Sequence, residues 1–299
     1  MKGKPVQLIL GAINIVTHPH SSERYLEHFI TAIEQQRQRK ASVRLRGETH
    51  GIISNWFPIN QRDALGGIEG EFLTFFEIGD LQDWHRLDNN KPASEIDVRN
   101  ALSLPGGIRP KGRPIRYVFY PREHILIYAQ KIQNRFIAPN SALKLVKDTL
   151  NFPSALEQGF PVAEVTLCQS REEIERLLAS PHLKKLEIAY GRPNPDDHAE
   201  LENEILRTME KQGADLFGEH LISTSSGRFL SPDDNTKAKA RVASRNGFVY
   251  AEEIIDGKKL KTKTSEHPAE FSTLAPIHQE DLASIVRRSS QTFLNSLTE

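Results

Sequence analysis

The sequence predicts an α+β fold in two parts, with mixed sheets and packed helices. Short apolar, β-branched runs alternate with longer amphipathic segments along the 299 residues. Gly and Pro interrupt the chain near residues 159–161, where a second set of strands and helices begins. We therefore expect an N-terminal α+β domain over residues 1–158 and a C-terminal α+β domain with a basic hairpin over residues 159–299.

The first element is a continuously apolar run, Val6 to Val16, which is typical of a central strand buried on both faces. With Lys2 and Lys4 before it, the run loosely resembles a signal peptide. However, Gln7 and Asn14 interrupt the apolar stretch, and no small-residue cleavage site follows. We therefore interpret residues 6–16 as the first strand.

A helix is expected next, from Ser21 or Ser22 to about Lys40, because a serine can cap it and apolar side chains recur at helical spacing. Its apolar face is formed by Tyr25, Leu26, Phe29, Ile30 and Ile33. Further strands are expected at residues 43–53, 71–78, 115–120 and 124–130. The stretch 87–112 is polar and contains Pro and Gly, which favours a long connection with one short helix.

The C-terminal half opens with a strand, a helix and a strand. "AEVTLC" (163–168) and "LKKLEIAY" (183–190) have strand character, and "SREEIERLLAS" (170–180) has the capping box Ser170 and Glu173. This order predicts a parallel or split βαβ unit of the ferredoxin-like kind. Helices are also expected at residues 196–212, 234–245 and 279–297, the second of them with a left-handed stop at Asn246-Gly247.

The stretch "DGKKLKTKTSEHP" (256–268) carries four lysines within six positions. Asp256-Gly257 is a strong signal for a two-residue hairpin turn. The expected cross-strand pairs are Ile255–Lys258, Ile254–Lys259, Glu252–Lys261 and Tyr250–Lys263. Three lysines then share one face with a tyrosine. This pattern fits a surface that binds a polyanion, and it also fits the ordinary polar face of a hairpin at a sheet edge.

Charge segregation favours the polyanion interpretation. The whole chain has no net charge, but residues 237–263 hold eight bases and three acids (+5), and residues 171–220 hold seven bases and twelve acids (−5). Two further stretches, "RQRKASVRLR" (37–46) and "RPKGRPIR" (109–116), are basic without any acid. The second is rich in Pro and Gly, and its arginines can contact phosphates in a bidentate manner.

Four stretches carry a family resemblance. "YVFYPREHILIYAQ" (117–130), "VAEVTLCQSREEIERLLASPHLKKLEIAYGRPN" (162–194), "FLSPDDNTKAKARVASRNGFVYAEEIIDGKKLKTKTSEHP" (229–268) and the last helix resemble a bacterial family of domains of unknown function, sometimes found in mobile elements and phage-defence loci. More distantly, the layout is similar to that of the RexA phage-exclusion protein, which binds DNA without being an enzyme. The resemblance implies a cytosolic bacterial protein, in anti-phage defence or nucleic-acid sensing, and it supplies no catalytic residues.

We therefore expect a non-enzymatic protein that binds the phosphate backbone of DNA or RNA with little sequence preference. It would need no cofactor and no metal, and it would act in the cytoplasm with a defence-system partner protein. A single cysteine, Cys168, suits a reducing compartment, and no apolar run approaches the length of a membrane span. The expected binding residues are Arg109, Lys111, Arg113, Arg116, Lys237, Lys239, Arg241, Arg245, Tyr250, Lys259, Lys261 and Lys263.

A homodimer would lengthen such a binding surface. The last helix carries an apolar stripe that fits either a dimer contact or core packing. The stripe consists of Leu282, Ile285, Val286, Ser289, Phe293 and Leu297.

Two other function classes remain open. A metal-dependent nuclease would use Glu164, Glu187 and Lys185, which the predicted βαβ unit places on neighbouring strands. The pair His18-x-His20 could also begin a metal site, with His50 and His124 available as further ligands. In the other class, a partner-binding subunit, the acidic region 171–220 would dock another protein.

Overall fold

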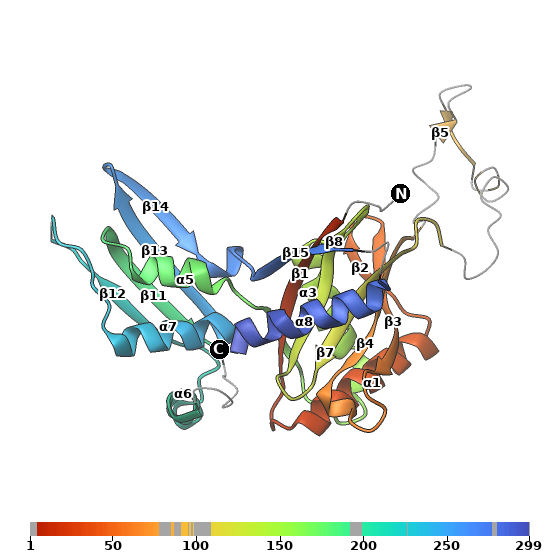
Figure 1. The fold of residues 1–299 in the computed structure, drawn as a ribbon, viewed down its shortest axis with the longest axis horizontal. Helices are drawn as coiled ribbons and strands as arrows, with labels where there is room; N and C mark the ends of the chain where they lie inside the picture. The colour runs from red at the N-terminus through yellow and green to blue at the C-terminus, as the bar shows by residue number, and fades with distance from the viewer. Residues whose placement is uncertain are drawn as a thin grey trace.

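The structure, a computed structural model, describes residues 5–77, 85–86, 91–94, 96, 98, 109–191, 199–225, 227–276 and 280–298, with the backbone alone at residues 85, 199, 245 and 246. Helices and strands are both abundant in this part of the chain, so the predicted α+β class is confirmed. Figure 1 shows two parts side by side, one built on a nine-stranded sheet and one on a four-stranded sheet. Two short strands, β5 (His85–Arg86) and β6 (Lys91–Pro92), pair with each other in a separate two-stranded sheet.

The nine-stranded sheet is built around its first strand. Its members are β1 (Val6–Val16), β2 (Val43–Arg46), β3 (Thr49–Pro58), β4 (Ile68–Phe76), β7 (Arg113–Tyr120), β8 (Ile125–Ile132), β9 (Arg135–Phe136), β10 (Glu164–Leu167) and β15 (Glu270–Ala275). The order is β10-β1-β8-β7-β4-β3-β2, and β9 pairs with β8. One edge of β1 pairs with β8, and its other edge pairs with β15 and β10, placed end to end. β1 is therefore central, as predicted.

Helices cover both faces of this sheet. They are α1 (Ser22–Gln38), α3 (Pro139–Leu150), α4 (Pro153–Leu156) and α8 (Leu282–Thr298). Tyr117 and Phe119 of β7 point to one face and contact Phe29 of α1. Tyr120, on the opposite face, forms a 2.8 Å hydrogen bond between its Oη and Oγ of Ser290 in α8. Burial on both faces explains why the strands are continuously apolar.

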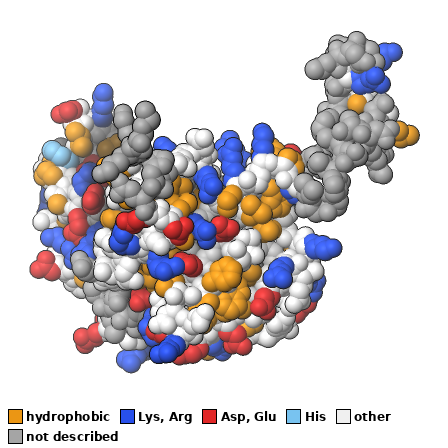
Figure 2. All heavy atoms as spheres, turned by 45° about the vertical axis from the view of Figure 1, so that its right-hand side comes forward, with side chains coloured by type: hydrophobic (Ala, Val, Ile, Leu, Met, Phe, Trp, Pro, Cys, Tyr) orange, Lys and Arg blue, Asp and Glu red, His pale blue; other side chains and the backbone are white. Residues whose placement is uncertain are grey.

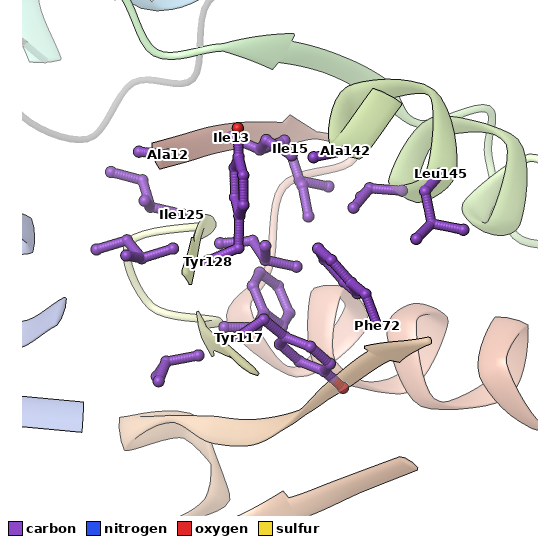
Figure 3. Close-up of a cluster of buried hydrophobic side chains, with 14 of the residues drawn as sticks. Ala12, Ile13, Ile15, Phe72, Tyr117, Ile125, Tyr128, Ala142 and Leu145 are labelled. Atoms are coloured by element: carbon purple, nitrogen blue, oxygen red, sulfur yellow. The ribbon is translucent and has the colours of Figure 1, made fainter. Parts of the chain in front are cut away.

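Aromatic rings fill much of the core between the sheet and α1 and α3. Phe72 of β4 and Tyr117 stack with their ring centroids 5.0 Å apart. Figure 3 shows both rings beside Tyr128, with Ala142 and Leu145 of α3 closing the cluster. The predicted cap of α1 is confirmed, because the Ser21 side chain accepts a hydrogen bond from the Arg24 N–H.

The four-stranded sheet forms a smaller lobe with its own core. Its strands are β11 (Leu183–Tyr190), β12 (Phe217–Ile222), β13 (Gly247–Ile255) and β14 (Lys258–Lys263), in the order β12-β11-β13-β14. Its helices are α5 (Arg171–Leu178), α6 (Ala199–Gln212) and α7 (Asp234–Asn246). The three helices and one face of the sheet enclose a second apolar cluster, separate from the main core.

The lobe is an insertion in the large sheet. The chain leaves the large sheet after β10, builds the lobe, and returns to the large sheet at β15. The boundary between the two sheets therefore does not lie between residues 158 and 159, where we placed the domain boundary. Residues on both sides of the lobe, among them Val165, Leu167 and Ala275, belong to the main core.

The expected βαβ unit is not formed. β10 pairs antiparallel with β1 in the large sheet, and β11 pairs antiparallel with β12 and β13 in the small one. The helix between them, α5, is capped by Ser170 as predicted, since its Oγ accepts from the Glu173 N–H. Local signals identified the three elements correctly, but their pairing is decided by distant strands.

Two local predictions are also corrected. The expected strand over residues 43–53 is a hairpin of β2 and β3, because Gly47 takes a φ of 53° and turns the chain. The expected left-handed stop at Gly247 is absent, because its φ of 178° is extended and the residue begins β13. A Cβ at Gly247 would lie 1.9 Å from the Ala189 carbonyl oxygen, so close packing against β11 requires glycine there.

The apolar stripe of the last helix is core, not a free surface. Ile285, Val286 and Phe293 are buried in the main cluster, and Phe293 stacks on Phe271 of β15. The stripe is therefore occupied within the chain, which removes it as the dimer contact. None of the helices in the described part of the chain has the length and apolar character needed to cross a bilayer.

Candidate nucleic-acid interface

The lysine-rich hairpin forms as predicted. Asp256 and Gly257 take φ values of 50° and 73°, which is the left-handed geometry of a two-residue hairpin turn. The four expected cross-strand pairs are all present. Lys259, Lys261 and Lys263 therefore share one face of β14, next to Tyr250 of β13.

This face belongs to the whole four-stranded sheet. Leu186, Ile188, Val249 and Ala251 point toward the helices and lie in the lobe core. Because side chains alternate along a strand, their neighbours point the other way. We call this second set the open face: Lys185, Glu187, His220, Ile222, Phe248, Tyr250, Glu252, Ile254, Lys259, Lys261 and Lys263. Its aromatic and aliphatic members belong to neither hydrophobic cluster.

Strand pairing orders the open face into rows. One row runs across the sheet as Ile222, Lys185, Glu252 and Lys261, and the next as His220, Glu187, Tyr250 and Lys263. Neighbouring strands are about 4.8 Å apart, so the members of a row are side by side. Each row ends on a lysine of β14.

Ion pairs neutralise part of the open face. Lys185 Nζ is 3.2 Å from Glu187 Oε2, and Lys259 Nζ is 2.5 Å from Glu252 Oε2. In the described part of the chain, Lys261 forms no ion pair. Four lysines against two glutamates leave a charge of +2 on this face.

Tyr250 is held as a neutral ring. Its Oη donates a 2.7 Å hydrogen bond to Glu252 Oε1. That bond raises the pKa of Tyr250 to about 12. The Glu252 carboxyl has a lowered pKa, first because Lys259 binds it and then because Tyr250 donates to it.

Two lysines lie over the aromatic rings of this face. Lys263 Nζ is 4.1 Å from the centroid of the Phe248 ring, and Lys185 Nζ is 5.2 Å from that of Tyr250. Both rings are partly exposed. The open face thus combines ammonium groups with aromatic surface, which is the pairing that single-stranded nucleic acids bind.

The basic residues of α7 lie on the other side of the sheet. Lys239 forms an ion pair with Glu219, and Arg241 Nε is 2.6 Å from Glu175 Oε1 of α5. Lys237 Nζ is 3.9 Å from Asp234 Oδ1 in its own helix. The structure therefore does not bring these predicted residues onto the open face, and the Arg245 side chain lies outside the described residues.

The arginine-rich segment lies on the large sheet, away from the hairpin (Figure 1). Arg109 Nε is 2.9 Å from Glu77 Oε2, and Arg116 Nε is 3.3 Å from Glu71 Oε1. Lys111 lies over the Phe76 ring, and Arg113 is exposed. Figure 2 brings this side of the molecule forward and shows basic and acidic side chains interspersed. The expected basic segments therefore form separate surfaces. The open face brings four lysines and the rings of Phe248 and Tyr250 onto one side of the small sheet.

The residues expected for a nuclease are separated. Glu164 belongs to β10 of the large sheet, whereas Lys185 and Glu187 belong to β11 of the small sheet. Among the described residues, no group of three or more His, Cys, Asp or Glu side chains could hold a metal ion.

Two of the histidines considered as metal ligands form a side-chain hydrogen bond through Nδ1. His20 Nδ1 is 2.9 Å from Tyr25 Oη, and His124 Nδ1 is 2.7 Å from Asn14 Oδ1. Cys168 is a buried free thiol.

Sequence reasoning missed Phe248 and His220 on the open face. Phe248 shares a strand face with Tyr250 and Glu252, so the strand period of two residues could have placed it there. β12 was not expected at all, because "FGEHLI" mixes Gly and charged residues and lacks a β-branched run. His220 therefore had no assigned position.

The model of a family described as "Domain of unknown function (DUF4747)" matches residues 6–291. No curated protein shows significant similarity to the chain.

Proposed function

Because the chain belongs to the DUF4747 family of domains of unknown function, its activity must be inferred from its own surface, and we propose that it binds nucleic acid through the open face. The main observation in support is that Lys259, Lys261 and Lys263 line one face of the small sheet together with Tyr250 and Phe248. Lysines neutralise phosphates, and aromatic rings accept bases without sequence preference.

Protection of the sheet edge explains only part of this surface. Lysines on an edge strand such as β14 prevent strands from different molecules from pairing. That role does not account for Lys185 on β11 or for the partly exposed rings of Phe248 and Tyr250 on β13, because both strands are internal to the sheet. A ligand that uses ammonium groups and aromatic surface together accounts for all of them.

The modest charge of the face sets the expected binding behaviour. Three lysines that neutralise three phosphates of a single strand give a slope of log affinity against log salt of about −2. The interaction should therefore be clearly salt-dependent and should tolerate different sequences.

The test is a binding titration with labelled DNA and RNA oligonucleotides across a salt series, without added metal. The key variant is Lys259→Gln/Lys261→Gln/Lys263→Gln. Its matched control, Lys131→Gln/Lys144→Gln/Lys147→Gln, removes the same charge from exposed positions of the large part. We expect the first variant to lose about tenfold or more in affinity and most of its salt slope. An equal loss in the control would refute binding through the open face.

We also propose that this binding serves anti-phage defence in the bacterial cytoplasm, which is what the family resemblance implies. The experiment compares phage plating on cells that express the wild type, the hairpin variant or the matched control. Protection by the wild type and the control, but not by the hairpin variant, is the expected result. Equal protection by all three proteins would show that defence does not depend on the hairpin lysines, whatever the outcome of the binding titration.

A further inference from the structure

We infer that the open face selects single-stranded nucleic acid and that bases stack on Phe248 and Tyr250; this inference rests on the proposed function. Both rings come from the same strand, two residues apart, and point to the same face. Each also has a lysine ammonium over it.

The spacing of the rings excludes stacked bases. Two positions along a strand are separated by about 6.8 Å. Bases in a duplex are about 3.4 Å apart along each strand and cover one another's faces. A base can lie on Phe248 while its neighbour lies on Tyr250 only if the two bases have separated. A single strand can adopt that arrangement, whereas a duplex must first be opened.

The lysines over the rings give the same strand its phosphate contacts. Lys263 lies over Phe248, and Lys185 lies over Tyr250. An ammonium on a partly exposed ring is weakly held, and a base stacks on such a ring more strongly. In the described part of the chain Lys263 forms no ion pair, so a phosphate can attract its ammonium and leave the Phe248 ring to the adjoining base. Lys185 is also held by Glu187, so its ammonium must leave that carboxylate before it can contact the phosphate next to Tyr250.

The small net charge also favours a single strand. A duplex carries one phosphate charge per about 1.7 Å of its axis, twice the density of one strand. The charge of +2 on the open face matches a few phosphates of one strand, and Glu187 and Glu252 oppose a denser array. Because charge alone is limited, stacking has to contribute much of the affinity.

The experiment compares an oligonucleotide with its duplex at one salt concentration. The variant is Phe248→Val/Tyr250→Val, which keeps strand propensity and removes both rings. The matched control is Phe57→Val/Phe136→Val, since these phenylalanines are 57% and 53% exposed on the large sheet. Tyr250→Phe serves as a second variant, because it keeps the ring. Thermal unfolding by circular dichroism establishes that each variant is folded.

We expect the wild type to bind the single strand more tightly than the duplex. The double valine variant should lose about tenfold or more for each ring. Tyr250→Phe should lose less than the double valine variant because it keeps the ring, and the control should retain its affinity. Fluorescence of 2-aminopurine in the oligonucleotide should be quenched by the wild type and not by the double valine variant.

The failures of the two proposals are distinct. The inference is wrong if the duplex binds as tightly as the single strand or more tightly, or if the double valine variant keeps its affinity. The proposed function still stands in that case if the affinity depends on the hairpin lysines. If the double valine variant does not fold, single-strand selectivity and quenching by the wild type and Tyr250→Phe decide the matter. If the wild type shows no salt-dependent binding, both proposals are wrong.

Discussion

Glu252 binds Lys259 and not Lys261, although Lys261 is its direct cross-strand neighbour. The Lys259 Nζ to Glu252 Oε2 distance is 2.5 Å, and the residue opposite Lys259 in the register is Ile254. Because Glu252 pairs diagonally with Lys259, the two lysines differ in how strongly their ammonium groups are held. Lys259 is already engaged by a carboxylate, whereas Lys261 has no ion pair in the described part of the chain.

The first prediction follows from that inequivalence. Lys261→Gln should weaken single-strand binding more than Lys259→Gln, because an ammonium held by a carboxylate has less to gain from a phosphate. Glu252→Gln should strengthen binding, since it removes a negative charge and releases Lys259. The measurement is the dissociation constant of each single variant at fixed salt. A larger loss from Lys259→Gln would show that the pair opens on binding.

The second prediction concerns the close approach of β4 to β3. A Cβ at Gly70 would lie 2.1 Å from the Asn55 carbonyl oxygen and 2.6 Å from Tyr117 Oη. Gly70→Ala should therefore lower the free energy of unfolding by about 1–3 kcal/mol, as overpacking does. Gly112→Ala is the control, because its added Cβ would meet its nearest atom at 3.7 Å. Chemical denaturation measures both, and equal stability of the two variants would contradict the packing described.

The third prediction tests the role of the last helix. Phe293 is buried in the main core against Phe271. Phe293→Ala should cost about 3–5 kcal/mol of stability, the usual range for a buried phenylalanine. Size-exclusion chromatography of the folded variant should show the oligomeric state of the wild type. Dissociation without loss of stability would instead assign the stripe to an interface between subunits.

The fourth prediction concerns stability at acid pH. The Arg241 guanidinium lowers the pKa of Glu175 from its ordinary value of 4.5. A carboxyl whose pKa is lowered on folding stabilises the protein above its unfolded pKa, and this contribution is lost as the pH falls through the folded pKa. The pair is partly exposed, so its contribution should be about 1 kcal/mol or less.

Thermal unfolding of the wild type and of Arg241→Gln tests this. The difference in Tm should be present at pH 7 and should shrink as the pH falls below 4.5. A difference that does not change with pH would show that Arg241 contributes through packing of its aliphatic stem.

Local sequence rules predicted what local interactions determine. The caps at Ser21 and Ser170 and the turn at Asp256 each depend on a few adjacent residues, and all three are present. The hairpin register followed from the turn, so the lysine face followed as well.

Long-range pairing was not predictable in the same way. β10 and β15 are short and join β1 from positions more than a hundred residues apart, and no local signal encodes that choice. The same limit explains the basic residues of α7. Lys239 and Arg241 looked available in the sequence, but the fold places Glu219 and Glu175 beside them. Which charges remain unpaired depends on topology.

The entry and exit of the lobe are themselves hydrogen-bonded neighbours. The Ala269 N–H donates to the Cys168 carbonyl oxygen at 2.7 Å, and Gln169 and Pro268 form a β-bridge. A segment whose ends are so close can be gained, lost or exchanged as one cassette, because a very short linker restores the chain. The large sheet can thus stay unchanged while the small lobe diverges, so related proteins can differ in the lobe without rebuilding the main core.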